Sequence, residues 1–584
     1  VPDRSPAQAW FQDVRRETRI VQRIEGIPIA MKSTYRFLAV VLTLTVLAPM
    51  AARADVSSVE ITERTPIEDG RAFGDTGPYE LIAGRITFAV DPADPRNQVI
   101  ASLDRAPTNA DGMVEATGDL QILAPADPAR GNGVVLVDIA NRGRLTALGF
   151  NRGGSGPFGD GFLMKAGYTV VWVGWEFDVP EGRPIRFAVP SVDGDPVGGL
   201  GFAAVRDTAS WIKHDPDATV TAGHALSFGS SQSGRFLRTF LYLGFNTDTE
   251  GRRVFDGVIP HIAGASRLDL NQPGANPISL GMFDATSFPF ADAALRDPVT
   301  GAVDGTLGNE RSRDNQPRIF YTNTGVEYWG GGRVATLVHA TPDGEADIDL
   351  QDNVRFYLLA GTQHGPGPFP PPPDSGNRQE MGNPTDYWWN MRALLTGLKD
   401  WVVDGVEPPA SRHPRFADGN LVPPPDLGFP AIPGVRSPHD RTGGSRVRNP
   451  LLAGADDAGV PLPMLVPAVD ADGNETSGIV HPEVAVPLAT YTGWNFTHPD
   501  AGDPDTLVSL AGSYVPFAAT RAEREAAGDP RPSIEERYAS RDEFMEKVGA
   551  VGHALVADRY LLADDLPAIL DRAGRHWDLL AGDR

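Results

Sequence analysis

The sequence predicts an α/β protein built on a mainly parallel sheet with flanking helices. From residue 133 onward, short continuous apolar runs such as 134–139 (VVLVDI) and 168–173 (YTVVWV) alternate with segments of helical periodicity. Such runs are typical of strands buried on both faces, as in parallel sheets with crossover helices. Before residue 133 apolar and polar residues alternate instead, as in 79–90, which predicts an antiparallel β region at the edge of the sheet.

The remaining elements follow from the same periodicities. Further strands are expected at 225–228, 255–262, 318–321 and 354–360, and helices at 203–213, 233–243 and 391–402. Residues 263–317 show no clear periodicity and are long enough to hold an inserted lid or cap. An edge strand is expected at 485–489, because Pro487 would remove a hydrogen-bond donor from a central strand, and residues 533–580 are expected to be helical with an interruption near Pro567.

These patterns divide the chain into five parts. We expect 1–30 to be a non-native or over-extended N-terminus, 31–54 a signal peptide, 55–132 the N-terminal β region, 133–405 the α/β core with its insertion at 263–317, and 406–584 a Pro-rich wrap and a C-terminal helical region packed on the core.

The signal-peptide prediction rests on an apolar run at 37–50 (FLAVVLTLTVLAPM), which follows the basic residues Lys32 and Arg36. Small residues at Ala52 and Ala54 suit cleavage before Asp55. The alternative is an uncleaved membrane anchor, although the run is short for a bilayer span. The pattern favours a secreted or periplasmic protein with no stable membrane span after cleavage.

Charge and cysteine content exclude several classes of function. The chain has 52 Lys and Arg against 76 Asp and Glu, a net charge of -24. This charge repels phosphate backbones, so nucleic acid is not expected as a partner. With no cysteine there is no disulfide, no thiolate metal site and no thiol nucleophile.

The strongest candidate for chemistry is a serine in a turn between a predicted strand and a predicted helix. Residues 226–236 read LSFGSSQSGRF, which places Gly229 two residues before Ser231 and Ser233 two residues after it. A nucleophile elbow needs small residues there, because strand end and helix start nearly touch. Ser231 is therefore the predicted nucleophile; choosing Ser233 would put the bulky Arg235 at a crowded position. A plain turn or helix cap is the competing interpretation.

A nucleophilic serine needs a base after the last strand of such a sheet. His364 lies on the loop after the predicted strand 354–360, beside Gly365 and a stiff Pro-rich stretch. His261 is the main rival, although it comes too early in the chain for the expected order of nucleophile, acid and base.

The acid that orients the histidine is expected after the preceding strand, and Glu327 occupies that place. Asp256 and Asp352 are the alternatives. The chain order Ser231, Glu327, His364 matches the order nucleophile, acid, base.

An oxyanion intermediate needs two backbone N–H donors. One is expected from Gln232, which follows the nucleophile, and the second from Asn141 or Arg142, on the loop after the predicted strand 134–139. Arg142 and Arg144 could also be surface charges or could attract an anionic substrate group.

Four motifs taken together resemble the large bacterial α/β-hydrolase-domain family: GSSQSGRFLR at 229–238, YTNTGVEYW at 321–329, AGTQHG at 360–365 and YTGWN at 491–495. The resemblance extends from about residue 56 to the C-terminus. It implies the α/β-hydrolase fold and a serine–histidine–acid site, with Ser231, Glu327 and His364 at the matching positions. A more distant similarity is to glucuronoyl esterases, in which an arginine follows the serine; Gln232 stands there in this chain.

These observations lead to the expectation of a secreted serine hydrolase that cleaves small-molecule or polymeric carboxylic esters through an acyl-enzyme. Such chemistry needs no metal and no organic cofactor. A peptidase or another acyl hydrolase is the alternative within the enzymes. A non-catalytic carbohydrate- or surface-binding protein on a hydrolase scaffold is the alternative outside them, and it predicts ligand binding without turnover.

Overall fold

The computed structural model describes residues 56–154, 156–275, 285–330, 333–446 and 461–582. The expected N-terminal extension and signal peptide, 1–54, lie outside these residues. The described residues form an 11-stranded sheet in the order β1-β2-β3-β5-β4-β9-β10-β14-β15-β20, with β6 paired to β3. Its strands are β1 Val56–Pro66, β2 Tyr79–Val90, β3 Val114–Pro125, β4 Val134–Ile139, β5 Thr169–Val173, β6 Phe187–Ala188, β9 His224–Ser230, β10 Gly257–His261, β14 Arg318–Thr324, β15 Val354–Ala360 and β20 Ile479–Val480.

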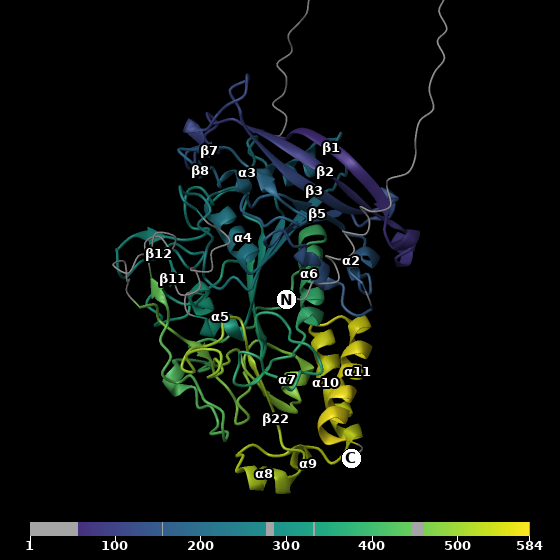
Figure 1. The fold of residues 1–584 in the computed structure, drawn as a ribbon, viewed down its shortest axis with the longest axis vertical. Coiled ribbons are helices and arrows are strands. Elements are labelled where there is room, and N and C mark those ends of the chain that lie inside the picture. Colours follow the sequence, from purple (N-terminus) through teal and green to yellow (C-terminus); the bar gives the residue numbers. More distant parts are fainter. Residues whose placement is uncertain (1–55, 155, 276–284, 331–332, 447–460, 583–584) are drawn as a thin grey trace, which may run out of the picture.

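The sheet changes from antiparallel to parallel along its width. The strands β1, β2 and β3 pair antiparallel with their neighbours, and β3 also joins β5 antiparallel. From β5 through β4, β9, β10, β14 and β15 to β20 every pairing is parallel. The predicted parallel core with an antiparallel N-terminal edge is therefore confirmed, and Figure 1 shows β1 to β3 at one end of the long axis.

Helices cover both faces of the parallel strands. Alternate residues of β4 belong to different clusters, Val135 and Val137 on one face and Val134 and Leu136 on the other. The first face packs on α3 (Leu200–His214) and α4 (Gln232–Tyr242), and the second on α2 (Phe162–Lys165) and α6 (Trp388–Val403). Because both faces are covered, strands with continuous apolar sequences are stable in this arrangement. Burial of each large apolar side chain contributes roughly 1.5–3 kcal/mol to the free energy of folding.

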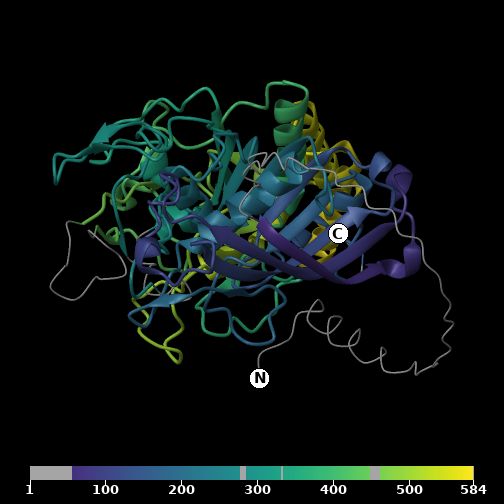
Figure 2. The ribbon, with the colours of Figure 1, turned by 90° about the horizontal axis from the view of Figure 1, so that it is seen from above.

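The C-terminal part of the chain adds helices against the second face. The helix α10 (Arg541–Ala557) and α11 (Leu566–Ala581) form a hairpin, and Figure 2 shows it in yellow, seen from above. Leu555 and Ile569 belong to the same apolar cluster as Leu398 of α6. The helical structure is interrupted between α10 and α11. Pro567 lies in the first turn of α11, where a proline costs no hydrogen bond.

The expected edge strand at 485–489 is wrong. Residues Pro482–Ala485 form the short helix α7, because His481 caps its start and Pro482 sits in the first turn. The strand β21 follows at Ala489–Tyr491 and belongs to a separate three-stranded sheet with β16 (Met381–Gly382) and β22 (Ser513–Pro516).

The insertion at 263–317 contains little regular structure in its described part. It has β11 (Ala285–Thr286), which pairs with β18 (Ser445–Arg446), and a hairpin of β12 (Leu295–Arg296) and β13 (Val303–Asp304). The other short elements are β7 Ser191–Val192, β8 Asp195–Pro196, α5 Gly325–Trp329, β17 Leu421–Val422, β19 Val466–Pro467, α8 Arg521–Ala527 and α9 Ile534–Arg537. Within the described ranges, no helix is both long and apolar enough to cross a bilayer.

Candidate active site

Ser231 occupies a sharp turn between β9 and α4. Its backbone has φ 61° and ψ −112°, a conformation that costs a residue with a side chain roughly 1–3 kcal/mol. The turn is tight, because a Cβ added to Gly229 would lie 2.4 Å from the carbonyl oxygen of Ser233. The Ser231 N–H donates to the carbonyl oxygen of His261 on β10, at 2.8 Å, which anchors the turn to the neighbouring strand.

The structure brings the three predicted residues Ser231, His364 and Glu327 into one hydrogen-bonded chain. The His364 Nε2 atom lies 2.9 Å from Ser231 Oγ. The His364 Nδ1 atom lies 2.6 Å from Glu327 Oε1. They come from the carboxyl ends of β9, β14 and β15, which parallel pairing places at one edge of the sheet.

The two oxygens of Glu327 have separate partners. Glu327 is the third residue of α5, and its Oε2 accepts hydrogen bonds from the N–H and the hydroxyl of the N-cap Thr324, in a capping box. Oε1 accepts from His364 and, at 3.4 Å, from Arg333. Burial alone would raise the pKa of Glu327, but His364 and Arg333 outweigh it and hold that pKa at about 2.

His364 is held in place and kept neutral. The Tyr387 hydroxyl donates to its backbone carbonyl oxygen at 2.7 Å. Burial lowers the pKa of the imidazole, and the Arg333 charge adds to this effect, whereas Glu327 opposes it. A neutral imidazole within hydrogen-bond distance of a serine hydroxyl can accept its proton, so the arrangement suits general-base chemistry.

The predicted oxyanion donors lie at two places, the start of α4 for Gln232 and the turn after β4 for Asn141 and Arg142. Gln232 begins α4, where backbone N–H groups point out of the helix start at the sheet edge. The Asn141 N–H donates to the carbonyl oxygen of Arg144 at 3.0 Å, within a tight turn, and the Asn141 side chain donates to the Ser230 carbonyl oxygen. Arg142 has a positive φ of 49° in the same turn. That Asn141 or Arg142 supplies the second N–H donor to the oxyanion stays a prediction.

The carboxyl group of Glu176 was not singled out from the sequence, yet it borders this site. It follows β5, is 1% exposed, and its Oε1 accepts from the Gln232 side chain at 2.7 Å. Burial raises the pKa of Glu176 to about 7, against the opposing hydrogen bond from Gln232. No local pattern marks this glutamate, whereas the Thr324 to Glu327 capping box could have been recognised from its T-x-x-E spacing.

The rival histidine lies at the same sheet edge as Ser231, but its ring has other partners. His261 is fully buried within β10, with its Nδ1 2.9 Å from the Thr322 hydroxyl and its Nε2 3.3 Å from the Tyr387 hydroxyl. Burial lowers its pKa to about 3. Both ring nitrogens are engaged, so His261 supports the strand end from behind the elbow.

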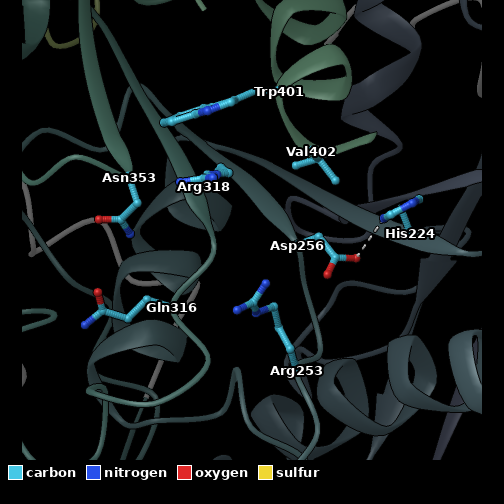
Figure 3. A pocket seen from close by; sticks show the side chains of 8 residues that line it. All are labelled: His224, Arg253, Asp256, Gln316, Arg318, Asn353, Trp401 and Val402. Carbon is cyan, nitrogen blue, oxygen red and sulfur yellow. Dashed lines mark ion pairs between the residues drawn. The ribbon is translucent and has the colours of Figure 1, made fainter. Parts of the chain in front are cut away.

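The rival acids lie at the opposite edge of the sheet. Asp256 precedes β10, and its carboxylate contacts the Lys213 ammonium and the Ala225 N–H, at 3.0 and 2.9 Å. Asp352 similarly precedes β15. A five-residue strand spans roughly 16 Å, so neither carboxylate reaches His364. Asp256 instead lines a pocket of about 320 Å³ with His224 and Arg318 (Figure 3).

Among the residues that the structure describes, no three His, Asp or Glu side chains are grouped so as to hold a metal ion.

Comparisons with known proteins agree with this architecture. A family model described as "Alpha/beta hydrolase domain" matches residues 104–571, well over half of the chain. No curated protein matches the sequence significantly.

Two solved structures show partial likeness. The rice cell wall degrading esterase LipA from Xanthomonas oryzae is 14% identical, over 36% of this chain and 50% of LipA, with a TM-score of 0.21. This chain thus spans about half the length of LipA. Est1E from Butyrivibrio proteoclasticus, solved with ferulic acid, is 7% identical over 37% of this chain and 77% of Est1E, with a TM-score of 0.19. Likenesses at this level carry no argument about function.

The family match and the topology of the sheet agree with each other. The match begins before β3 and ends within α11, so it includes the parallel strands, the elbow and the loops that carry Glu327 and His364. The chain belongs to the family of proteins with an alpha/beta hydrolase domain.

Proposed function

We propose that this protein is a serine hydrolase that cleaves carboxylic esters through an acyl-enzyme intermediate. The observation that carries the proposal is the hydrogen-bonded chain from Ser231 through His364 to Glu327, with contacts of 2.9 and 2.6 Å. A strained serine at a strand-to-helix turn, a neutral imidazole and a buried carboxylate are the parts that nucleophilic acyl transfer needs.

The reaction proceeds in two steps. His364 Nε2 takes the proton of Ser231 as Oγ attacks the ester carbonyl, and the oxyanion is held by N–H groups that include that of Gln232. The bond to the alcohol oxygen breaks, and His364 returns the proton to that oxygen. Water then loses a proton to His364 and attacks the acyl carbon. The bond between that carbon and Ser231 Oγ breaks, His364 returns the proton to Oγ, and the acid leaves. Glu327 stabilises the imidazolium in both steps.

The direct test is fluorophosphonate labelling of the full chain followed by peptide mapping. We expect label on Ser231, and no label in Ser231→Ala or His364→Ala. Ser233→Ala is the matched control, because it removes a hydroxyl from the same turn and should keep the label. Label on Ser233 would move the nucleophile by two residues. A folded protein that takes no label but binds carbohydrate tightly would favour the non-catalytic alternative.

The ester preference is tested separately from the nucleophile. Matched aryl esters and aryl amides of the same acyl group distinguish an esterase from a peptidase, because only the leaving group differs. Turnover of the esters with none detected on the amides supports the proposal, and amide turnover that depends on Ser231 contradicts it.

We also propose that the protein is secreted or periplasmic. This rests on the apolar run at 37–50 with small residues at Ala52 and Ala54. N-terminal sequencing of protein recovered from an expressing bacterium should find Asp55 first; an intact N-terminal segment in the cytoplasm would contradict it.

A further inference from the structure

A second buried carboxyl group, that of Glu475, lies between the segments that carry the acid and the base. Glu475 is 5% exposed, and its Oε2 accepts a hydrogen bond from the Gly361 N–H at 2.8 Å. Gly361 directly follows β15 and stands three residues before His364. One oxygen of Glu475 therefore holds the start of the loop that carries the histidine.

The other oxygen of Glu475 reaches the start of α5. A Cβ added to Gly325 would lie 2.5 Å from Glu475 Oε1 and 3.0 Å from the Cα atom of Gly493. Gly325 is the first residue of α5, two residues before Glu327. Because glycine has no side chain, it leaves room for the carboxyl group at this helix start.

Glu475 is itself held by the neighbouring residue and by β21. The Asn474 side chain donates to the Ala489 carbonyl oxygen at 3.2 Å and accepts a hydrogen bond from the Tyr491 N–H at 2.8 Å. Tyr491 begins the motif at 491–495, which supplies no member of the serine–histidine–glutamate chain. The motif therefore helps to fix the place of Glu475.

The surroundings of Glu475 favour its neutral form. Its Oε1 is buried and has no hydrogen-bond partner among the residues that the structure describes. A buried oxygen without a donor is less stable when it is charged than when it is neutral. Burial raises the pKa of Glu475 to about 7, and the charge of Glu327 adds to this effect, whereas the Gly361 N–H opposes it.

The ionisable groups of α5 that face Glu475 are Glu327 and Tyr328. Burial raises the pKa of the Tyr328 phenol well above its ordinary value, and both carboxyl groups add to this effect, so the phenol stays neutral. Glu327 has a pKa of about 2 and is charged. The environment thus gives two nearby carboxyl groups different forms.

We propose that Glu475 positions the acid–histidine pair: as a neutral carboxyl group it spans the start of α5 and the end of β15, and so fixes Glu327 relative to His364. The reacting atoms remain those of Ser231 and His364. A charged group in the place of Glu475 would repel the carboxylate that His364 needs. The inference rests on the proposed ester hydrolysis at Ser231.

The first test compares Glu475→Ala with Glu475→Gln on a neutral aryl ester. Glutamine keeps the size of the side chain and an oxygen that can accept from Gly361, but it carries no charge. With kcat expressed per Ser231 that takes the fluorophosphonate label, unfolded protein does not count. At about pH 6 we expect kcat to fall roughly 10- to 100-fold in Glu475→Ala and no more than about threefold in Glu475→Gln, with little change in KM. Equal losses in both variants, or no loss in Glu475→Ala, would overturn the proposal.

The second test asks whether the carboxyl group is neutral in the folded protein. Between its ordinary pKa of 4.5 and about 7, Glu475 keeps a proton in the folded protein that it has lost in the unfolded chain. The stability of the wild type therefore decreases as pH rises through this range, whereas Glu475→Gln has no such proton. The urea midpoint of Glu475→Gln minus that of the wild type should increase from about pH 5 to about pH 8.

Glu407→Gln is the control for this titration, because it removes a carboxyl group whose side chain is 72% exposed. Its midpoint difference from the wild type should stay constant with pH. A constant or decreasing difference for Glu475→Gln would overturn the proposal.

A third measurement separates this inference from the proposed function. The proton between His364 Nδ1 and Glu327 gives a downfield NMR resonance that needs no turnover, and it should persist in Glu475→Gln and disappear in Glu475→Ala. If Ser231 takes the label but Glu475→Ala keeps both kcat and this resonance, the esterase proposal stands and the inference fails. If the wild type shows neither label nor turnover, but Glu475→Ala alone loses the resonance, the inference stands and the esterase proposal fails.

Discussion

At the scale of single residues, the site depends on the hydrogen bonds of the two carboxylate oxygens of Glu327. Oε2 accepts hydrogen bonds from Thr324, the N-cap residue of α5, and Oε1 accepts one from His364. The helix start thus fixes the carboxylate orientation before any substrate binds. Thr324 and Glu327 lie only three residues apart, so this half of the geometry is local, whereas His364 is brought in by the pairing of β14 with β15.

Substituting the acid should cost catalysis more than stability. Glu327→Gln keeps the size of the side chain but no longer stabilises the imidazolium, so we expect kcat on a neutral aryl ester to fall roughly 10²- to 10⁴-fold. Asp256→Asn is the control at the rival position and should change kcat by less than about threefold, since Asp256 lies at the other sheet edge. A large loss of kcat in Asp256→Asn with little change in Glu327→Gln would mean that Asp256, and not Glu327, is the acid.

The pH dependence follows from the neutral form of His364. The base form is required, so kcat/KM should rise as pH increases through the pKa of His364, which burial and Arg333 hold below the ordinary value of 6.5 for an imidazole. The acid limb should therefore have its midpoint below 6.5. Arg333→Gln removes a cation that lowers this pKa and should shift the limb to higher pH. A wild-type midpoint above 7 would contradict the burial of His364.

At the scale of elements, the elbow works because β9, β10 and α4 approach one another closely. The sequence indicated a strand, a small-residue turn and a helix here, and the structure has β9 ending at Ser230 and α4 beginning at Gln232. The periodicity that predicted a strand at 485–489 failed, since a helix cap at His481 and Pro482 competed with it.

Because β9 and α4 approach each other closely at the elbow, we expect that a side chain added at Gly229 destabilises the protein. In Gly229→Ala the new Cβ would lie 2.4 Å from the Ser233 carbonyl oxygen, so backbone has to shift. We expect a loss of about 1–3 kcal/mol in the free energy of unfolding, measured in urea, and slower labelling of Ser231. Gly223→Ala is the matched control just before the same strand, because its Cβ would meet nothing nearer than 3.9 Å. Equal effects of both substitutions would contradict this account.

At the scale of the whole molecule, one buried arginine joins the core to the C-terminal helices. Arg392 of α6 donates to Asp565 beside α11 at 2.7 Å, to Asp160 at 2.6 Å, and to the carbonyl oxygen of Phe150. Its side chain is 2% exposed. This contact accompanies the apolar packing of Leu555 and Ile569 against the second face of the sheet.

Removing this charge should leave two carboxylates without their cation. We expect Arg392→Leu to lower the free energy of unfolding by about 3–5 kcal/mol in equilibrium denaturation. Arg575→Leu breaks the Arg575–Asp571 pair, whose side chains are 58% and 69% exposed, and should cost about 1 kcal/mol or less. Comparable small losses in both variants would mean that the helical hairpin is held by apolar packing alone.

The sequence by itself determined the features that arise from neighbouring residues: the continuous apolar strands, the alternating N-terminal edge, the small-residue turn at Ser231, and the chain order of serine, glutamate and histidine. Only the tertiary structure decided which acid reaches His364 and that Glu176 borders Gln232. Periodicity and turn chemistry act over a few residues, so they are readable in one dimension. Contacts between segments about 100 residues apart depend on strand order and on which sheet edge each loop leaves, and no local pattern records either.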